Sequence, residues 1–125
     1  MRVGFDAKRI FHNTTGLGNY SRDLVKNLAK YYPDHACILF NPKSPKVDRL
    51  TIENNMKIVQ PQSWLSKKIP SLWRSFYINK SIRQENIDIF HGLSGELPFG
   101  INKTDVKSVV TIHDLIFIHF PELYH

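Results

Sequence analysis

The sequence is poor in cysteine and has no long apolar run. Cys37 is the single cysteine among 125 residues, so an intrachain disulfide is excluded and a buried, reduced thiol is expected. No stretch approaches the roughly 20 apolar residues that cross a bilayer. Charges at Arg2 and Asp6 interrupt the N-terminal segment too early for a secretory signal. These absences predict a cytoplasmic protein.

Two common nucleotide-binding patterns are also missing. Gly16 and Gly18 begin a dinucleotide pattern, but Ser21 stands in the third glycine place, and Phe40-Asn41 stands where an acidic residue should end the second strand. No Gly-Lys-Ser/Thr follows the glycines, which excludes a P-loop. The sequence therefore disfavours NAD and P-loop nucleotide chemistry.

No short-spaced metal motif and no nucleophile elbow is present. We therefore expect no metal, although a zinc site is conceivable if distant side chains meet in space, from His91, His113, Asp114 and His119. The segment from Gly92 to Gly95 has the wrong spacing for Gly-x-Ser-x-Gly.

The charge of the chain is unbalanced toward the basic side. Seventeen Lys and Arg against eleven Asp and Glu give a formal net charge of +6, while hydrophobic residues make up 42%. The apolar content is sufficient for a folded core rather than disorder. The basic excess favours an anionic partner, such as a membrane surface or a phosphorylated small molecule, or is a solvated surface without any partner. We expect no nucleic acid, since no nucleic-acid-binding motif accompanies the charge.

Short apolar runs alternate with helical spacing along the chain. Strands are expected at residues 2–10, 36–40, 56–59, 87–90 and 107–112, with helices from Leu17 to about residue 31 and at residues 71–84 after Pro70. No helix is expected in the apolar run 115–118. Strands joined by crossover helices predict an α/β fold, with a mainly parallel sheet and helices on both faces.

Ligands of such sheets bind at the carboxyl ends of the strands. Polar, glycine and histidine residues collect at three of these predicted ends, at residues 8–18, 91–95 and 113–114. This coincidence predicts a ligand site at that edge of the sheet.

The segment 14–20 joins the first strand to the first long helix. Glycine allows close approach of backbone amides to a ligand, and a helix N-terminus favours negative charge. A phosphate or a sugar hydroxyl fits there, with Gly16, Leu17, Gly18 and Asn19 as the candidate binding residues. The alternative is a tight turn that needs glycine only for its geometry.

His91 and His113-Asp114 follow neighbouring predicted strands. Because adjacent strands lie about 4.8 Å apart, these side chains can converge on one pocket. Histidine can donate to a hydroxyl or a carbonyl at neutral pH, and Asp114 can orient such a group. The alternative is two structural histidines. We expect Glu96 to be a solvent-exposed loop carboxylate.

Residues 64–77 combine aromatic and basic side chains. Such a surface can dock on anionic lipid. The alternative, which the sequence favours, is that the aromatic residues simply cover the sheet.

Three motifs together resemble one enzyme family. They are Thr15-Gly16-Leu17-Gly18-Asn19-Tyr20-Ser21, Ile87-Asp88-Ile89-Phe90-His91-Gly92 and Val110-Thr111-Ile112-His113-Asp114-Leu115. Their order and spacing resemble the N-terminal half of GT4-type retaining glycosyltransferases. The resemblance implies a GT-B fold, in which two Rossmann-like domains face a cleft.

The resemblance also implies roles. The glycine segment would lie beside the donor diphosphate and the acceptor, His113 would face the transferred sugar, and His91 would line the cleft. A nucleotide sugar and a hydroxyl acceptor would be the substrates, without a metal or another cofactor. Synthesis of a cell-surface polysaccharide or glycolipid would be a plausible setting, in the cytoplasm or at the inner face of the membrane.

The resemblance covers only the first half of such an enzyme. Residues 1–125 correspond to a partial, acceptor-side N-terminal domain, and the donor-binding domain, with its pair of glutamates, is missing. We therefore expect a truncated glycosyltransferase, inactive by itself. The alternative is a non-catalytic Rossmann-like module that binds a phosphorylated or lipid-linked ligand.

Overall fold

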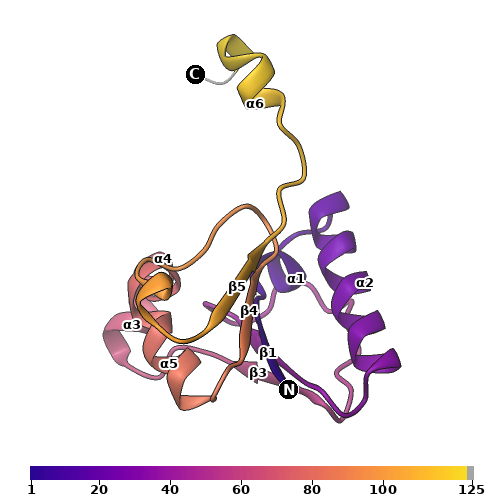
Figure 1. Ribbon diagram of the computed structural model, residues 1–125, viewed down its shortest axis with the longest axis vertical. Coiled ribbons are helices and arrows are strands. Elements are labelled where there is room, and N and C mark those ends of the chain that lie inside the picture. The colour runs from indigo at the N-terminus through magenta and orange to yellow at the C-terminus, as the bar shows by residue number, and fades with distance from the viewer. Residues whose placement is uncertain (124–125) are drawn as a thin grey trace.

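A five-stranded, all-parallel sheet forms the centre of the protein. The computed structural model describes residues 1–123 (Figure 1). The strands are β1 (Arg2–Asp6), β2 (Ala36–Phe40), β3 (Met56–Val59), β4 (Ile89–Gly92) and β5 (Lys107–Val110), in the spatial order β3-β2-β1-β4-β5. Every neighbouring pair is parallel. The predicted α/β class and parallel sheet are confirmed, in a Rossmann-like arrangement.

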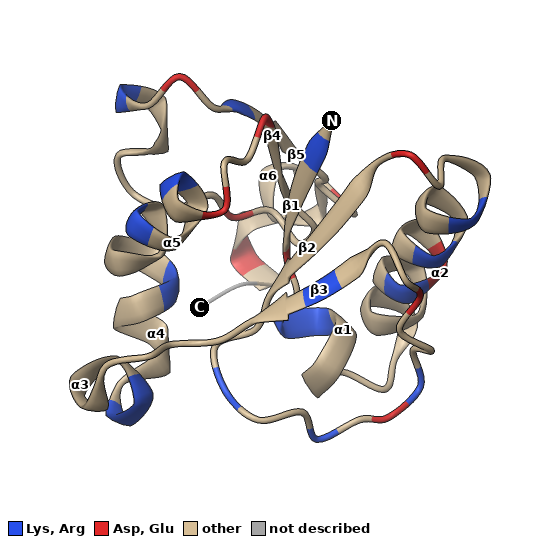
Figure 2. Cartoon of the chain, turned by 90° about the horizontal axis from the view of Figure 1, so that it is seen from below, with Lys and Arg blue, Asp and Glu red and all other residues tan. Residues whose placement is uncertain are grey.

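Alternation along the central strands divides the core into two layers. In β2, Cys37 and Leu39 join the cluster under α1 (Lys8–His12) and α2 (Gly16–Tyr31), whereas Ile38 and Phe40 join the cluster on the other face. Figure 2 shows α2 on one side of the sheet and α5 (Ile78–Gln84) on the other. The expected buried position of Cys37 is confirmed, and burial raises the pKa of its thiol.

The second helical layer is built from a segment with an irregular centre. The predicted helix 71–84 is present as α4 (Pro70–Leu72), a π-helical turn η1 (Trp73–Tyr77) and α5. The helix α3 (Trp64–Lys68) was not predicted, and its first turn is capped by the Ser63 hydroxyl, which accepts from the Ser66 amide. Within η1, Trp73 is buried, but Phe76 is exposed.

The first strand is shorter than expected. The prediction extended it to Ile10, but β1 ends at Asp6 and α1 follows. The Ala7 amide donates to the Phe40 carbonyl, while the Lys8 amide turns back to Asp6 Oδ1 at 3.2 Å. This side-chain bond competes with continued strand pairing and starts a helical turn.

The strand boundaries on the other side of the sheet also differ from the prediction. β4 lies two residues later than expected, so His91 is inside the strand, and β5 ends at Val110. The helices α6 (Ile116–His119) and η3 (Pro121–Leu123) were not predicted. A further short helix, η2 (Ile101–Lys103), lies between β4 and β5.

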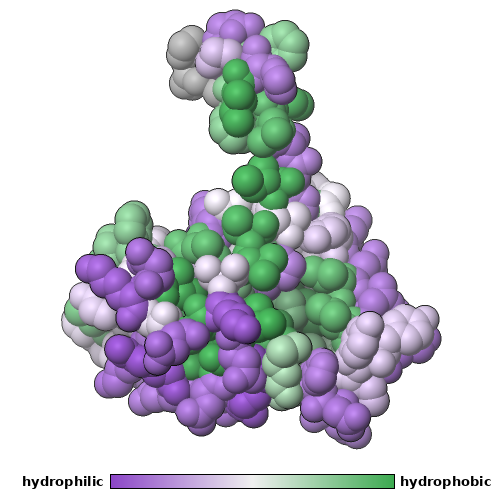
Figure 3. Space-filling view, viewed as in Figure 1, coloured by the Kyte–Doolittle hydropathy of each residue, from purple (hydrophilic) through white to green (hydrophobic). Residues whose placement is uncertain are grey.

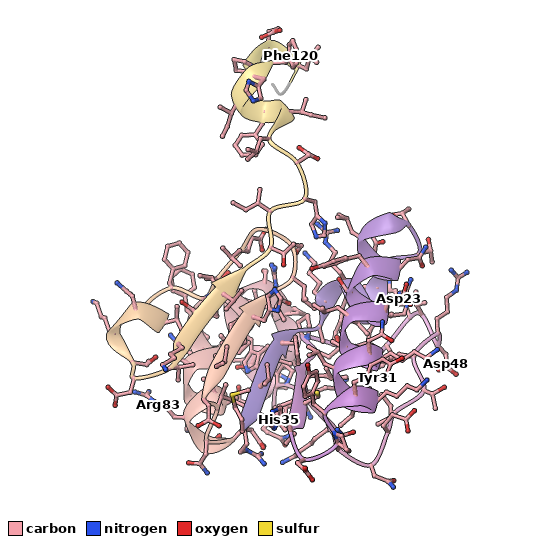
Figure 4. The ribbon with its side chains drawn as sticks, turned by 45° about the vertical axis from the view of Figure 1, so that its right-hand side comes forward. Asp23, Tyr31, His35, Asp48, Arg83 and Phe120 are labelled. Atoms are coloured by element: carbon pink, nitrogen blue, oxygen red, sulfur yellow. The ribbon has the colours of Figure 1, made fainter. Side chains whose placement is uncertain are left out.

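The residues after β5 form an arm, residues 111–123, that extends away from the sheet. Figure 1 shows α6 at its far end, and Figure 4 places Phe120 there, remote from the body. Figure 3 shows hydrophobic surface continuing from the body into the arm. Ile116, Phe117 and Ile118 are all exposed.

In residues 1–123, no helix combines the length and the apolar character needed to cross a bilayer.

Candidate functional site

The predicted glycine segment is the first turn of a helix rather than a loop. Gly16 to Asn19 open α2, with Thr15 at the N-cap. Asn13 Oδ1 accepts from the amides of Thr15 (2.9 Å) and Gly18 (3.0 Å). The amides of Gly16 and Leu17 have no acceptor within residues 1–123. These two amides, at the positive end of the helix dipole, remain available to an anion.

The space around the two glycines of this turn, Gly16 and Gly18, differs. A Cβ on Gly18 would lie 2.2 Å from the carbonyl oxygen of Asn13, so this position requires glycine for packing. A Cβ on Gly16 would meet nothing within 4 Å. The open space beside Gly16 permits close approach of a ligand to the backbone.

A buried guanidinium lies beneath the same turn. Arg22 is only 5% exposed and donates to the carbonyls of Ile10 and Asn13, both at 2.8 Å, and to Asn19 Oδ1 at 2.7 Å. All three acceptors are neutral. Burial, and then the charge of Arg49, lower the pKa of Arg22, against the opposing charge of Asp23. Arg22 was not among the predicted site residues, because in the sequence its position on α2 resembles that of an ordinary surface cation.

His91 is half-buried beneath the end of the sheet. Its Nε2 lies 2.8 Å from Thr111 Oγ1, and its ring packs 5.9 Å from that of Phe5. Burial lowers the pKa of His91 below its ordinary value near 6.5. Burial therefore favours the neutral ring, which can donate one hydrogen bond and accept another.

His113 lies beyond the end of β5, at the base of the arm. Its Nε2–H donates to the carbonyl of Leu93 at 2.8 Å. Since a carbonyl only accepts, this bond keeps a proton on Nε2, and Nδ1 is the ring nitrogen that does not take part in it.

Tyr20 connects the helix start with both histidines. Its hydroxyl lies 3.4 Å from Thr111 Oγ1, and its ring meets the ring of His113 edge-on, with centroids 4.9 Å apart. The backbone of Thr111 is held between Gly92 and Gly95 by two hydrogen bonds of 2.9 Å. The predicted elements therefore do converge, through Tyr20 and Thr111, which the predicted site did not include.

Asp114 does not join this cluster through any hydrogen bond to His113 in the described part of the chain. Its Oδ1 accepts from the Ile116 amide at 3.3 Å and so caps the start of α6. The role expected for Asp114, to orient a reacting or binding group at a catalytic site, stays a prediction.

A second polar cluster lies behind the end of β1. Arg74, from the π-helical turn, donates to Asp6 Oδ2 at 2.6 and 2.7 Å and pairs with Glu96 in the loop after β4. Burial alone would lower the pKa of Arg74, but the hydrogen bond and charge of Asp6, with those of Glu96, raise it. Glu96 is exposed, as predicted, yet it is not isolated. No sequence signal links these three residues.

Hollows of different sizes lie near the candidate site. One of about 370 Å³ is lined by Asn19 and Arg22 beside the start of α2, and one of about 20 Å³ adjoins Asp6, Arg74 and Glu96. A groove of about 590 Å³ lies instead along the helical layer from α3 to α5. A pocket's size alone does not identify the chemical site, and the convergent polar groups favour the strand ends.

The chemistry at the strand ends is that of a surface for an anion and for hydroxyl groups. In residues 1–123, no three His, Cys, Asp or Glu side chains gather to hold a metal ion, so the conceivable zinc site is not assembled.

Comparison with protein-family models, curated proteins and solved structures found no match for this chain.

Proposed function

We propose that this chain forms one wall of a glycosyl-transfer site that uses a nucleotide-sugar donor and a hydroxyl acceptor. The observation that carries the proposal is the convergence of the α2 N-terminus with His91, Thr111 and His113. The free amides of Gly16 and Leu17 suit a diphosphate, while the histidine side chains suit sugar hydroxyls. The same motifs support the proposal by their resemblance to the GT4 type.

The geometry suggests how these groups would act. In the transfer, the bond from the anomeric carbon to the diphosphate oxygen breaks and a bond to the acceptor oxygen forms, with retention of configuration. The acceptor's proton passes to the leaving diphosphate. The helix amides, with Arg22 behind them, stabilise the charge that develops on that group. His113, held by Leu93 and Tyr20, presents Nδ1 to a sugar hydroxyl.

The opposite wall of the cleft, with the donor base and a glutamate pair, is predicted to belong to a second domain. Residues 1–125 alone are therefore expected to show little or no turnover with a panel of nucleotide sugars, in contrast to the full-length parent protein. His113→Ala in the parent is expected to lower turnover tenfold to a hundredfold, through the loss of a positioned hydrogen bond. Robust turnover by residues 1–125 would overturn the two-domain proposal, and no turnover by the parent would overturn glycosyl transfer.

A non-catalytic module is the alternative function. The same free amides and basic surface would then hold a phosphorylated or lipid-linked ligand without chemistry. The parent open reading frame distinguishes the two: a second βαβ domain with a glutamate-rich donor motif supports the enzyme, and a stop codon after His125 supports the module.

We also propose that α3 and η1 dock at an anionic membrane, which would place a cytoplasmic protein at the inner face of the membrane. The expectation that these aromatic residues cover the sheet is wrong for most of them. Trp73 is buried, but Trp64 is 69% exposed and Phe76 and Tyr77 are 54% exposed each. Lys68 lies over the ring of Trp64 at 4.2 Å, beside Lys67. Exposed aromatic rings beside lysines are typical of interfacial helices.

Charge reversal on α3 should weaken this docking. Each basic residue near an anionic surface contributes about 1 kcal/mol, so Lys67→Glu/Lys68→Glu is expected to reduce binding tenfold or more. Co-sedimentation with phosphatidylglycerol-containing vesicles measures the effect. Arg74 is kept, because its partner Asp6 is buried. Lys26→Glu/Lys30→Glu on α2 is the matched control, and equal binding by both variants would rule out docking through α3.

A further inference from the structure

A basic groove runs along the helical layer, away from the strand ends. It has a volume of about 590 Å³, and its walls come from the start of α3, from η1, from α5 and from η2. Figure 2 shows basic residues along α3 to α5, on the side of the sheet opposite α2, and Figure 4 labels Arg83 on that side. Nothing in the proposed glycosyl-transfer site uses this groove.

All charged residues that line the groove are basic. Lys80, Arg83 and Lys103 line the groove, and no acidic residue does. Within residues 1–123, none of the three forms an ion pair with a carboxylate. Glu85, which follows α5, is instead held by Arg2 at 3.0 Å and Lys57 at 2.7 Å. Three cations around one hollow without internal counter-charges favour an anionic ligand.

The groove also offers neutral groups that match hydroxyls. Asn79 lines it and donates through Nδ2 to the Phe99 carbonyl at 2.7 Å. Asn79 Oδ1 is a buried acceptor without a hydrogen-bond partner in the described structure. Such an orphaned acceptor costs free energy, so a ligand hydroxyl that reached it would be bound favourably. Ser66 and Thr104 add further hydroxyls to the lining.

One wall is aromatic. Trp73, Phe76 and Tyr77 come from the π-helical turn η1 and line the groove together. Pockets for small molecules combine such apolar walls with a few polar groups that orient the ligand. Single π-helical turns are frequent at functional sites.

We propose that this groove binds a phosphate ester of a polyol. Arg83 suits a phosphate through its planar fork of donors, while Lys80 and Lys103 add point charges. The hydroxyls of the polyol face Asn79 and the aromatic wall. Both a soluble sugar phosphate and a glycerophosphate lipid headgroup have this chemistry. The inference does not depend on glycosyl transfer, because no residue is shared with the histidine cluster.

Calorimetric titration of the chain with a hexose phosphate tests the site. Binding is expected for the hexose phosphate, and at least tenfold weaker binding for inorganic phosphate and for the free hexose. Arg83→Gln/Lys103→Gln is expected to weaken binding of the hexose phosphate tenfold or more. Lys26→Gln/Lys30→Gln, which removes the same charge from α2, is expected to leave it unchanged. Unchanged far-ultraviolet circular dichroism verifies that both variants are folded.

A parallel titration with phosphatidylglycerol vesicles distinguishes the two sources of the ester. If Arg83→Gln/Lys103→Gln binds vesicles more weakly than the wild type does, and the wild type does not bind hexose phosphate, the ligand is a lipid headgroup. If the wild type binds hexose phosphate more tightly than this variant does, and the two bind vesicles equally, the ligand is a soluble ester. Equal weakening by both variants, equal affinity for inorganic phosphate and hexose phosphate, or no binding to either source overturns the proposal.

Discussion

Replacing Arg74 by methionine is expected to lower the free energy of unfolding by about 3–5 kcal/mol. The side chain of Asp6 is 6% exposed and that of Arg74 15% exposed, and the two meet at 2.6 Å. Methionine retains much of the arginine volume but removes its charge. The carboxylate of Asp6 then stays buried with only the Lys8 amide as a partner among the contacts observed. An unpaired buried charge is far costlier than a lost surface contact.

Urea denaturation of the variant measures this effect, with Lys57→Met as the matched control. Lys57 pairs with Glu85 at 2.7 Å, but its side chain is 57% exposed. An exposed pair contributes about 0–1 kcal/mol, so the control should change little. The double variant Asp6→Leu/Arg74→Met should recover most of the loss, because a buried pair can be replaced by apolar residues of similar volume. An equal effect of Arg74→Met and Lys57→Met would contradict the assigned burial of the pair.

The two glycines of α2 should respond in opposite directions to substitution by alanine. Gly18→Ala is expected to destabilise the fold by about 1–3 kcal/mol, as overpacking does, because the new Cβ meets backbone rather than a mobile side chain. Gly16→Ala has open space and is expected to stabilise the helix by up to about 1 kcal/mol. Thermal and urea unfolding of both variants measure the difference.

The variants Gly16→Ala and Gly18→Ala also distinguish a glycine needed for packing from one needed for ligand binding. Gly16→Ala keeps the fold but places a methyl group beside the free amides, so under the proposed function it should weaken binding of the donor diphosphate. If Gly18→Ala were as stable as the wild type, the contact with Asn13 would not explain that glycine. If Gly16→Ala bound the donor normally, the amides would not be the diphosphate site.

Local patterns in the sequence determined much of the architecture. The strands at residues 36–40 and 56–59 and the helix ending at Tyr31 agree with the prediction. Continuous apolar runs and a spacing of three and four residues are properties of neighbouring positions, so they can be recognised without a structure. The parallel sheet followed from the alternation of these elements, and the edge that holds Gly16, His91 and His113 followed from the sheet.

The boundaries and the contacts of the site were decided by the tertiary structure. Asp6 and Arg74 are 68 residues apart, and Tyr20 and Thr111 are 91 residues apart. Periodicity shows which face of an element is apolar, but not which polar groups meet once helices are placed on the sheet. Exposure of Trp64 has the same origin, since α3 buries none of its residues in the described fold. The sequence by itself determined the sheet and the edge that carries the candidate site. Only the packing of distant elements decided which groups are paired, buried or free there, because those contacts depend on register and helix placement.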